Sequence, residues 1–273
     1  SFFTEFERFD RHVEKLRRAA EENRVHYVSI CSPNHLHDAH IRFALRVGAH
    51  AICEKPIVLN PWNCEALAEI ETESGRRIYT ILQLRLHPVI RELKARLDQE
   101  KPNGKHEVLL SYVTARGKWY HYSWKGIREK SGGLATNIGI HFFDLLIWLF
   151  GPVQASEVHY DSPLRTAGLL ELEKARVRWF LSIDRNDLPA GPASNGRATY
   201  RSISIDGREV EFSEGFTDLH TVSYEKILAG EGFGISAAQP SIRLCHDIRT
   251  TAANGLSADS HPFLAESLRR NGR

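Results

Sequence analysis

One βαβ unit, spanning residues 27–56, restricts the possible folds more than any other part of this chain. Residues 27–31 form a short apolar run, Ser32-Pro33-Asn34 interrupts it, and apolar residues then recur at helical spacing as far as Val47. Gly48 predicts the end of this helix, and residues 51–53 form a second buried strand. Ligands bind at the carboxyl ends of such parallel strands. We therefore expect Ser32-Pro33-Asn34 and Glu54-Lys55-Pro56 to face one crevice.

The rest of the first hundred residues continues this alternation of strands and helices. The pattern predicts the end of a strand followed by an amphipathic helix within residues 2–23, a crossover helix at 63–74, a strand at 78–82 and a helix at 89–97. We expect residues 1–100 to form a dinucleotide-binding domain of the Rossmann type, built on a parallel sheet.

Beyond the turn at residues 101–104 the strands lengthen and alternate in polarity. Strands are expected at residues 107–115, 155–160, 168–173, 175–182, 200–206 and 209–212, with a hairpin at Asp206-Gly207. An apolar helix at 138–150 would cover one face of this sheet, residues 188–197 form a surface loop, and helices at 224–228 and 240–253 follow. The predicted fold class is α/β: the Rossmann-type domain, truncated at its amino end, plus an α+β domain over residues 101–273 with a large, mostly antiparallel sheet.

Composition argues against several classes of protein. The net charge of +2 predicts no surface for polyanions, and no stretch approaches the apolar length of a membrane span. The four cysteines have no CxxC spacing, and Cys31 and Cys53 fall on predicted buried strands, so we expect reduced thiols in a cytoplasmic protein. His35, His37 and His40 lie near Cys31, but a zinc site needs four converging ligands, and Cys31 is expected to point into a strand core. We expect no metal.

Two groups of polar residues could carry chemistry. Lys55 lies at the end of a predicted strand, where its ammonium could hydrogen-bond a substrate hydroxyl; a surface Glu-Lys pair is the equally simple alternative. Asn137, His141 and Asp144 follow one another at spacings of four and three, on one face of the apolar helix. Buried polar groups are costly unless they are satisfied, so three of them favour a polar pocket over a helix surface. A core histidine capped by Asp144 would leave Asn137 unexplained.

Together these motifs resemble the Gfo/Idh/MocA family of nicotinamide-dependent oxidoreductases. The motifs occur in the family's order: Ser32-Pro33-Asn34 with His37, then Glu54-Lys55-Pro56, then Gly132-Gly133 with Asn137, His141 and Asp144. A closer similarity is to the bacterial UDP-N-acetyl-2-amino-2-deoxyglucuronate 3-dehydrogenases of lipopolysaccharide sugar synthesis. It rests on residues 116–120, 123–126, 175–182 and 214–220.

This resemblance implies oxidation of the C3 hydroxyl of a UDP-linked amino-sugar uronate, UDP-GlcNAcA, by hydride transfer to NAD. His141 would take the hydroxyl proton, since an ordinary histidine pKa near 6.5 suits a general base. Lys55 would orient and acidify the hydroxyl, Asn137 would position the sugar, and Asp144 would hold the imidazole. A 2-oxo acid is the implied acceptor that recycles NADH, and the implied assembly is a homo-oligomer, a tetramer or a dimer.

The implied site residues form three sets. The catalytic set is Lys55, His141, Asn137 and Asp144, and the cofactor-binding set is Ser32, Pro33, Asn34, His37, Glu54, Lys55 and Gln83. The substrate-binding set is Arg85, Arg116, Trp119, Tyr120, Trp124, Lys125, Asn137 and His141. Its cations suit a diphosphate and a uronate, and its rings suit a uracil or a sugar. The same mixture of basic and aromatic residues can bind single-stranded nucleic acid, which the low net charge disfavours.

The chain departs from the family pattern at its amino end, where a strand, a Gly-rich turn and an acidic residue are expected. None of its 19 glycines forms G-x-G-x-x-G. We expect the first βαβ unit to be missing, so that this chain binds NAD weakly or not at all and the activity belongs to the parent enzyme. Two alternatives stay open: a catalytically silent sugar-nucleotide binding protein, and a family dehydrogenase of a free sugar, inositol or a biliverdin-like compound.

Overall fold

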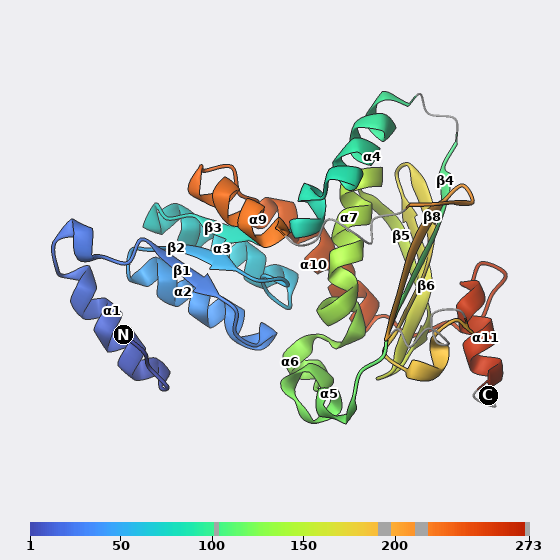
Figure 1. Cartoon of the computed structure of the whole chain (residues 1–273), viewed down its shortest axis with the longest axis horizontal. Coiled ribbons are helices and arrows are strands. Elements are labelled where there is room, and N and C mark those ends of the chain that lie inside the picture. Colours follow the sequence, from blue (N-terminus) through green and yellow to red (C-terminus); the bar gives the residue numbers. More distant parts are fainter. Residues whose placement is uncertain (101–103, 191–197, 211–217, 271–273) are drawn as a thin grey trace.

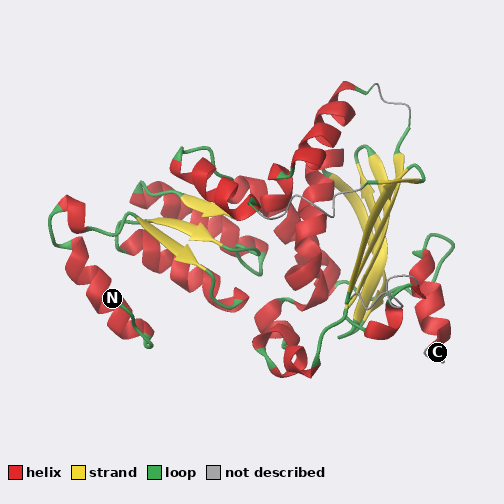
Figure 2. Cartoon of the chain, in the orientation of Figure 1, coloured by secondary structure: helices red, strands yellow, loops and turns green. Residues whose placement is uncertain are grey.

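The structure is a computed structural model that describes residues 1–100, 104–190, 198–210 and 218–270. In this described part the strands form two sheets (Figure 1). One has three strands in the order β1-β2-β3, and the other has six in the order β5-β6-β7-β4-β8-β9. Figure 2 shows helices against both sheets and between them. The predicted combination of a Rossmann-type sheet with a second, larger sheet is confirmed.

The small sheet is the Rossmann-type part of the fold. Its strands are β1 (Tyr27–Ile30), β2 (His50–Cys53) and β3 (Ile78–Thr80), and all of them run parallel. The crossovers are α2 (His37–Arg46) and α3 (Pro61–Ser74). Gly48 and Gly75 follow these helices with φ of 81° and 62°, a left-handed conformation that glycine adopts without strain. The βαβ unit predicted at residues 27–56 is confirmed.

Helices cover both faces of the small sheet. Ala51 and Cys53 of β2 belong to the core shared with α2 and α3, whereas Ile52 between them faces the other way. There Ile52 packs against Tyr224 and Ile227 of α9 (Leu219–Leu228), which Figure 1 shows across the sheet from α2 and α3. The sequence predicts only residues 224–228 of this helix. A segment from late in the chain therefore completes the small sheet.

Helix α1 (Phe6–Arg17) packs on α2, where its Val13 is buried against Phe43. Residues 1–5 contain no strand, so the strand end expected before α1 is wrong. The physical reason is local packing. The ring of Phe3 contacts Phe9 and His12 of α1 instead of a neighbouring strand.

The large sheet is mixed but mostly antiparallel. Its strands are β4 (His106–Thr114), β5 (Val153–Asp161), β6 (Arg165–Leu172), β7 (Ala175–Ser182), β8 (Thr199–Ile205) and β9 (Arg208–Glu209). Among the described pairings β4 and β7 are parallel, and the others are antiparallel. Asp206 and Gly207, at φ of 51° and 77°, form the predicted hairpin turn. Most of the expected loop 188–197 and the end of the expected strand 209–212 lie outside the described residues.

Helix α7 (Ile140–Phe150) covers one face of the large sheet, where Phe143 packs edge-on against Trp179 of β7 with ring centroids 5.2 Å apart. Helix α10 (Ile235–Thr250) packs against both α7 and α3, and α4 (Pro88–Gln99) packs against α7. Helix α11 (Pro262–Arg270), which the sequence analysis does not predict, covers the opposite face through Leu264 (Figure 1). Because α10 contacts helices of both sheets, the division at residue 100 stays a prediction.

Shorter helical turns connect these elements. They are α5 (Lys118–Tyr122), α6 (Arg128–Ser131), a π-helix (Ala135–Gly139) and single 3₁₀ turns at Glu21–Asn23, Asn34–Leu36, Gln83–Leu86, Trp124–Gly126 and Arg185–Asp187. The helical stretch Arg128–Phe150, 23 residues with mean hydropathy 1.5, is long and apolar enough to span a membrane, contrary to the expectation from the sequence. Since 72% of its apolar window is buried inside the described protein, it is a core helix.

The cysteines differ in burial. Cys53, Cys64 and Cys245 are buried thiols, but Cys31 is exposed. The expectation that Cys31 points into a strand core is therefore wrong. Strand β1 already ends at Ile30, so Cys31 belongs to the turn that follows it.

Candidate active site

A cavity of about 250 Å³ lies where the carboxyl end of the small sheet meets α7 and the large sheet. It is lined by residues that follow β2 and β3, by residues of β4 and β8 or just after β4, and by the helical stretch: Lys55, Gln83, Leu84, Tyr112, Arg116, Asn137, Ile138, His141, Phe142 and Arg201. The structure thus brings together five predicted site residues from four separate stretches of the chain. These are Lys55, Gln83, Arg116, Asn137 and His141.

Lys55 is held at the wall of this cavity. Its Nζ donates a hydrogen bond to the main-chain oxygen of Asn137, 3.0 Å away. Burial lowers the pKa of Lys55 to about 8, although the neighbouring Glu54 carboxylate acts in the opposite direction and Lys125 adds to the decrease. An ammonium whose pKa lies this close to neutrality can donate a hydrogen bond and also exchange its proton.

The side chain of Asn137 is fixed by two buried neighbours. Its Nδ2 donates to the hydroxyl of Tyr120 at 2.9 Å, and its Oδ1 accepts from Nδ2 of Asn34 at 3.4 Å. Asn34 also donates to the main-chain oxygen of Ser131 at 3.0 Å. Asn34 and Tyr120 were expected to contact cofactor and substrate, respectively. In the structure both position Asn137.

His141 lies at the start of α7, partly buried, beside the cations of the cavity. Burial, and then the charges of Lys55 and Arg201, hold the pKa of His141 well below its ordinary value. The imidazole is therefore neutral at physiological pH and has a free electron pair to accept a proton. An anionic ligand between these cations would move the pKa of His141 back upward.

Asp144 does not hold the imidazole of His141. Its carboxylate forms a two-point ion pair with Arg85, with Nε to Oδ2 at 2.9 Å and Nη2 to Oδ1 at 2.7 Å. Arg85 also donates to the main-chain oxygen of Ala237 of α10. Both side chains are buried. Catalysis by Asp144 and substrate binding by Arg85 stay predictions. Spacing along a helix shows which residues share a face but not which partner that face meets.

His37 contacts two main-chain oxygens, and its predicted contact with a cofactor stays a prediction. It is buried, and its two ring nitrogens lie 2.7 Å from the main-chain oxygen of Pro56 and 2.8 Å from that of Ser32. It therefore ties together the turns that follow β1 and β2. The Oγ atom of Ser32 forms a hydrogen bond with Nδ1 of His40, at 2.9 Å.

Glu54 is paired with a residue that the sequence analysis does not assign to the site. Its Oε1 lies 3.3 Å from Nε2 of His220, at the start of α9. His220 also contributes to the low pKa of His141, less than burial, Lys55 and Arg201 do. The motif at 214–220 includes His220, but residues 211–217 lie outside the described part.

The basic and aromatic segment that follows β4 flanks the cavity. Arg116 lines it, while Lys125 Nζ lies over the rings of Trp119 and Trp124, 5.3 and 5.7 Å from their centroids. Trp119 is half exposed, at 53%. Substrate binding by Trp119, Trp124 and Lys125 stays a prediction.

Tyr112 and Arg201 are lining residues that sequence reasoning missed. They lie directly opposite each other on β4 and β8. Along each strand, successive side chains point to opposite faces of the sheet, so the neighbours of Tyr112 and of Arg201 on their strands face away from the cavity. The period of two gives their side of the sheet, but only the strand order shows that this side meets the end of the small sheet.

The described residues fit the nicotinamide end of a dinucleotide. Lys55 and Gln83 stand at the ends of β2 and β3, and Oε1 of Gln83 is buried without a hydrogen-bond partner among the described residues. Such an orphaned acceptor suits a donor like the amide group of nicotinamide. Among the described residues, no three His, Cys, Asp or Glu side chains gather to hold a metal ion.

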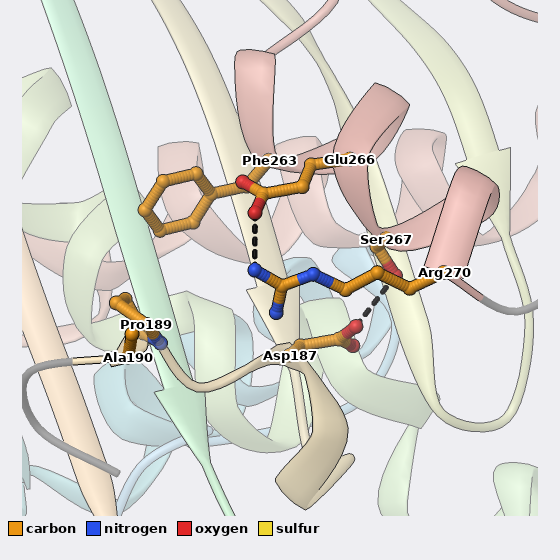
Figure 3. Close-up of a pocket in the computed structure, with 7 residues that line it drawn as sticks. All are labelled: Asp187, Pro189, Ala190, Phe263, Glu266, Ser267 and Arg270. Carbon is orange, nitrogen blue, oxygen red and sulfur yellow. Dashed lines mark hydrogen bonds and ion pairs between the residues drawn. The ribbon is translucent and has the colours of Figure 1, made fainter. Parts of the chain in front are cut away.

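Two other cavities lack the chemistry of a site. A hollow of about 1000 Å³ beside α10 and β5 contains three cations, but each pairs with a carboxylate: Arg85 with Asp144, Lys94 with Asp98 and Arg243 with Glu65. A pocket of about 170 Å³ lies beneath α11 (Figure 3). There Arg270 reaches back to Glu266, and Ser267 donates to the buried Asp187, so these polar groups satisfy one another.

Comparison with known proteins agrees with this architecture. The family model described as "Oxidoreductase family, NAD-binding Rossmann fold" matches residues 3–81, and the one described as "Oxidoreductase family, C-terminal alpha/beta domain" matches residues 105–187.

Among solved structures, the WlbA (WbpB) dehydrogenase from Thermus thermophilus is 56% identical. Its complex with NAD and alpha-ketoglutarate superposes with a TM-score of 0.92, covering 96% of this chain and 84% of that chain. Its complex with NAD and UDP-GlcNAcA has a TM-score of 0.91 over the same shares.

Among curated relatives, D-glucoside 3-dehydrogenase of Escherichia coli is 27% identical over 128 residues, which are 45% of this chain and 35% of that protein. The matched stretch thus spans about a third of the length of such relatives.

The fold and the cavity together define an oxidoreductase with an NAD-binding Rossmann domain and a second α/β domain. The chain belongs to the Gfo/Idh/MocA oxidoreductase family.

Proposed function

We propose that this protein oxidises the C3 hydroxyl of a UDP-linked N-acetylated amino-sugar uronate, UDP-GlcNAcA, to the 3-keto sugar. The observation that carries the proposal is the convergence of Lys55, Asn137 and His141 in one cavity that Arg116 and Arg201 also line. A uronate and a diphosphate both bring negative charge to such a cavity. The similarity to a dehydrogenase solved with NAD and UDP-GlcNAcA supports the same substrate.

Each of the three residues has a part in the proposed reaction. NAD, when bound, supplies the acceptor for the hydride that leaves C3. The neutral imidazole of His141 accepts the hydroxyl proton, and the Lys55 ammonium donates a hydrogen bond to the hydroxyl oxygen, which makes that proton easier to remove. Asn137, fixed by Tyr120 and Asn34, keeps the pocket in shape around the sugar.

Four further features belong to the proposal. The 2-oxo acid that reoxidises NADH is supported by the Thermus thermophilus complex with alpha-ketoglutarate. The place in lipopolysaccharide sugar synthesis and the assembly as a tetramer follow from the resemblance. Four free cysteines in the described part suit the cytoplasm.

The test is turnover by the purified protein with UDP-GlcNAcA and NAD, measured as NADH absorbance and as loss of two hydrogens from the sugar nucleotide by mass spectrometry. UDP-GlcNAc, which lacks the carboxylate, is the matched control substrate. We expect a keto product from UDP-GlcNAcA, faster when a 2-oxo acid is added. Calorimetric binding of UDP-GlcNAcA without turnover would identify a silent binding protein instead. Oxidation of a free sugar, without binding of the sugar nucleotide, would identify a different substrate.

A further inference from the structure

A π-helical turn, Ala135–Gly139, lies directly before α7 and contains Asn137. A π-helix pairs each N–H with the carbonyl five residues back, is rare, and occurs as a single turn frequently at functional sites. Side chains that insert into a helix's own hydrogen-bond ladder account for such local changes. We therefore looked for groups that the main chain of this turn meets.

Two main-chain carbonyls of the π turn accept hydrogen bonds from side chains of other elements. The oxygen of Asn137 accepts from Lys55 Nζ, at the end of β2, at 3.0 Å. The oxygen of Ala135 accepts from Cys245 Sγ of α10 at 3.3 Å. Lys55, which follows β2, and Cys245 of α10 therefore both hold the π turn in place.

The turn also lies unusually close to the large sheet. A Cβ atom added at Gly139 would stand 2.7 Å from Cδ1 of Leu181 on β7 and 2.7 Å from Cε2 of Phe143. Real Cβ atoms essentially never approach so closely, so glycine permits this packing. Together with the two carbonyl contacts, it leaves the turn little freedom to move.

We propose that the π turn is a positioning device for Lys55: it turns the main-chain carbonyl of Asn137 toward the Lys55 ammonium, and Cys245 holds the turn from α10. This inference rests on the proposed function, because it concerns how Lys55 is kept ready for a substrate hydroxyl. Cys245 and Gly139 are positioning residues that act through the turn.

The carbonyl contact has a consequence for the charge of Lys55. The Asn137 carbonyl oxygen stabilises the charged ammonium of Lys55 more than the neutral amine. It therefore opposes the decrease in the pKa of Lys55 that burial causes. Among the described residues, the other titratable groups near Lys55 include Glu54, beside it after β2, Lys125 and Arg116 after β4, and Cys245 on α10. Asp144 and His141 on α7 and Arg201 on β8 line the same cavities as Lys55. Weakening the carbonyl as an acceptor should therefore lower the pKa of Lys55 further.

A main-chain ester tests this directly. Replacing Ile138 by its α-hydroxy acid makes the Asn137 carbonyl a weaker acceptor and leaves every side chain in place. The matched control is the same change at Leu146 of α7, outside the π turn, which also removes one N–H but weakens the carbonyl of Leu145. Trace acylation of Lys55 over a pH series, read by peptide mass spectrometry, measures the pKa of this lysine without any substrate.

We expect the ester at Ile138 to lower the pKa of Lys55 by about one pH unit and the control ester to leave it within a few tenths of a unit. Unchanged labelling in both variants, or equal shifts in both, would overturn the proposal. The labelling result is independent of turnover, so a failure of the proposed function on UDP-GlcNAcA is distinguishable from a failure of this inference.

The contribution of Cys245 has its own test. Cys245→Ala removes the donor to Ala135, Cys245→Ser restores one, and Cys64→Ala is the control because Cys64 is an equally buried thiol on α3. We expect a lower pKa of Lys55 in Cys245→Ala alone, with the alkaline limit of kcat/KM shifted in the same direction. The same pKa in Cys245→Ala and in the unmodified protein would overturn the role of Cys245.

Discussion

Charged side chains gather on both faces of the large sheet, and the two clusters differ in how their charges are balanced. On the α7 face, Lys55 and Arg116 line the cavity, and no carboxylate is among the described residues that line it. On the α11 face, Arg165 pairs with both Asp184 and Asp187. Each charged group of the α11 cluster thus has an oppositely charged partner, whereas a cavity lined by cations is complementary to an anion.

Hydrogen bonds also satisfy the carboxylate of Asp187 on the α11 face. The carboxylate of Asp187 accepts from Arg165 Nε, from Ser182 Oγ and from Ser267 Oγ, each at 2.5 Å. These donors come from β6, β7 and α11, so the network fastens the helix to the sheet. The comparison shows that a cluster of charged side chains is not by itself evidence of a functional site. The predictions below test whether the cluster around Arg165 and Asp187 stabilises the fold and whether the cations of the cavity take part in the reaction.

The largest effect is expected at the cavity. Lys55→Met removes the ammonium that would hydrogen-bond the substrate hydroxyl, so kcat should fall by a factor of roughly 10²–10⁴, with the melting temperature nearly unchanged. Steady-state NADH formation and calorimetric binding of UDP-GlcNAcA measure this. Lys94→Met is the control, because Lys94 pairs with Asp98 on α4 and does not line the cavity. An unchanged kcat in Lys55→Met would remove Lys55 from the chemistry.

In the α11 cluster the expected effect is on stability. Arg165→Met leaves Asp187 buried with an uncompensated charge, which should lower the free energy of unfolding by about 3–5 kcal/mol in urea titrations. The double variant Arg165→Met with Asp187→Leu should recover part of this loss, because an apolar pair has no charge to compensate. We expect kcat/KM per folded molecule to stay within twofold. A tenfold decrease there would mean that the two faces are functionally coupled.

The pH profile distinguishes the two proton-carrying groups of the cavity. If Lys55 acts as a charged donor, its pKa of about 8 predicts that kcat/KM falls about tenfold per pH unit above that value, as the ammonium loses its proton. The low pKa of His141 places the acid limit below its ordinary value near 6.5. A rise in kcat/KM through pH 8 would instead make neutral Lys55 the base.

The smallest effect is expected at the rim of the balanced cluster. Arg270 and Glu266 form an ion pair on α11 in which each side chain is 46% exposed (Figure 3). Arg270→Ala should change the free energy of unfolding by at most about 1 kcal/mol, because solvent screens such pairs. The measurement is the urea titration used for Arg165→Met. A loss of several kcal/mol would show that α11 depends on its rim as much as on Asp187.

Part of the site could be predicted because its residues lie in short local motifs. Lys55 follows a strand that is recognisable from its apolar run, and Asn137 and His141 stand out as polar groups in an apolar helix. The contacts of Asp144 and His37 could not be predicted, because their partners are distant in the chain or are main-chain atoms. Asp144 meets Arg85, 59 residues away, and His37 meets two carbonyl oxygens. No spacing rule specifies either partner.

The sequence by itself determined the local structure: the βαβ unit, the hairpin at Asp206-Gly207, the apolar helix and the carboxyl ends at which polar turns occur. These follow from periodicity and from glycine conformation, which act over a few residues. Only the tertiary structure decided that Tyr112 and Arg201 face Lys55, that α9 completes the small sheet, and that a π turn brings the Asn137 carbonyl to Lys55. The physical reason is that strand order and helix packing depend on contacts between segments far apart in the chain.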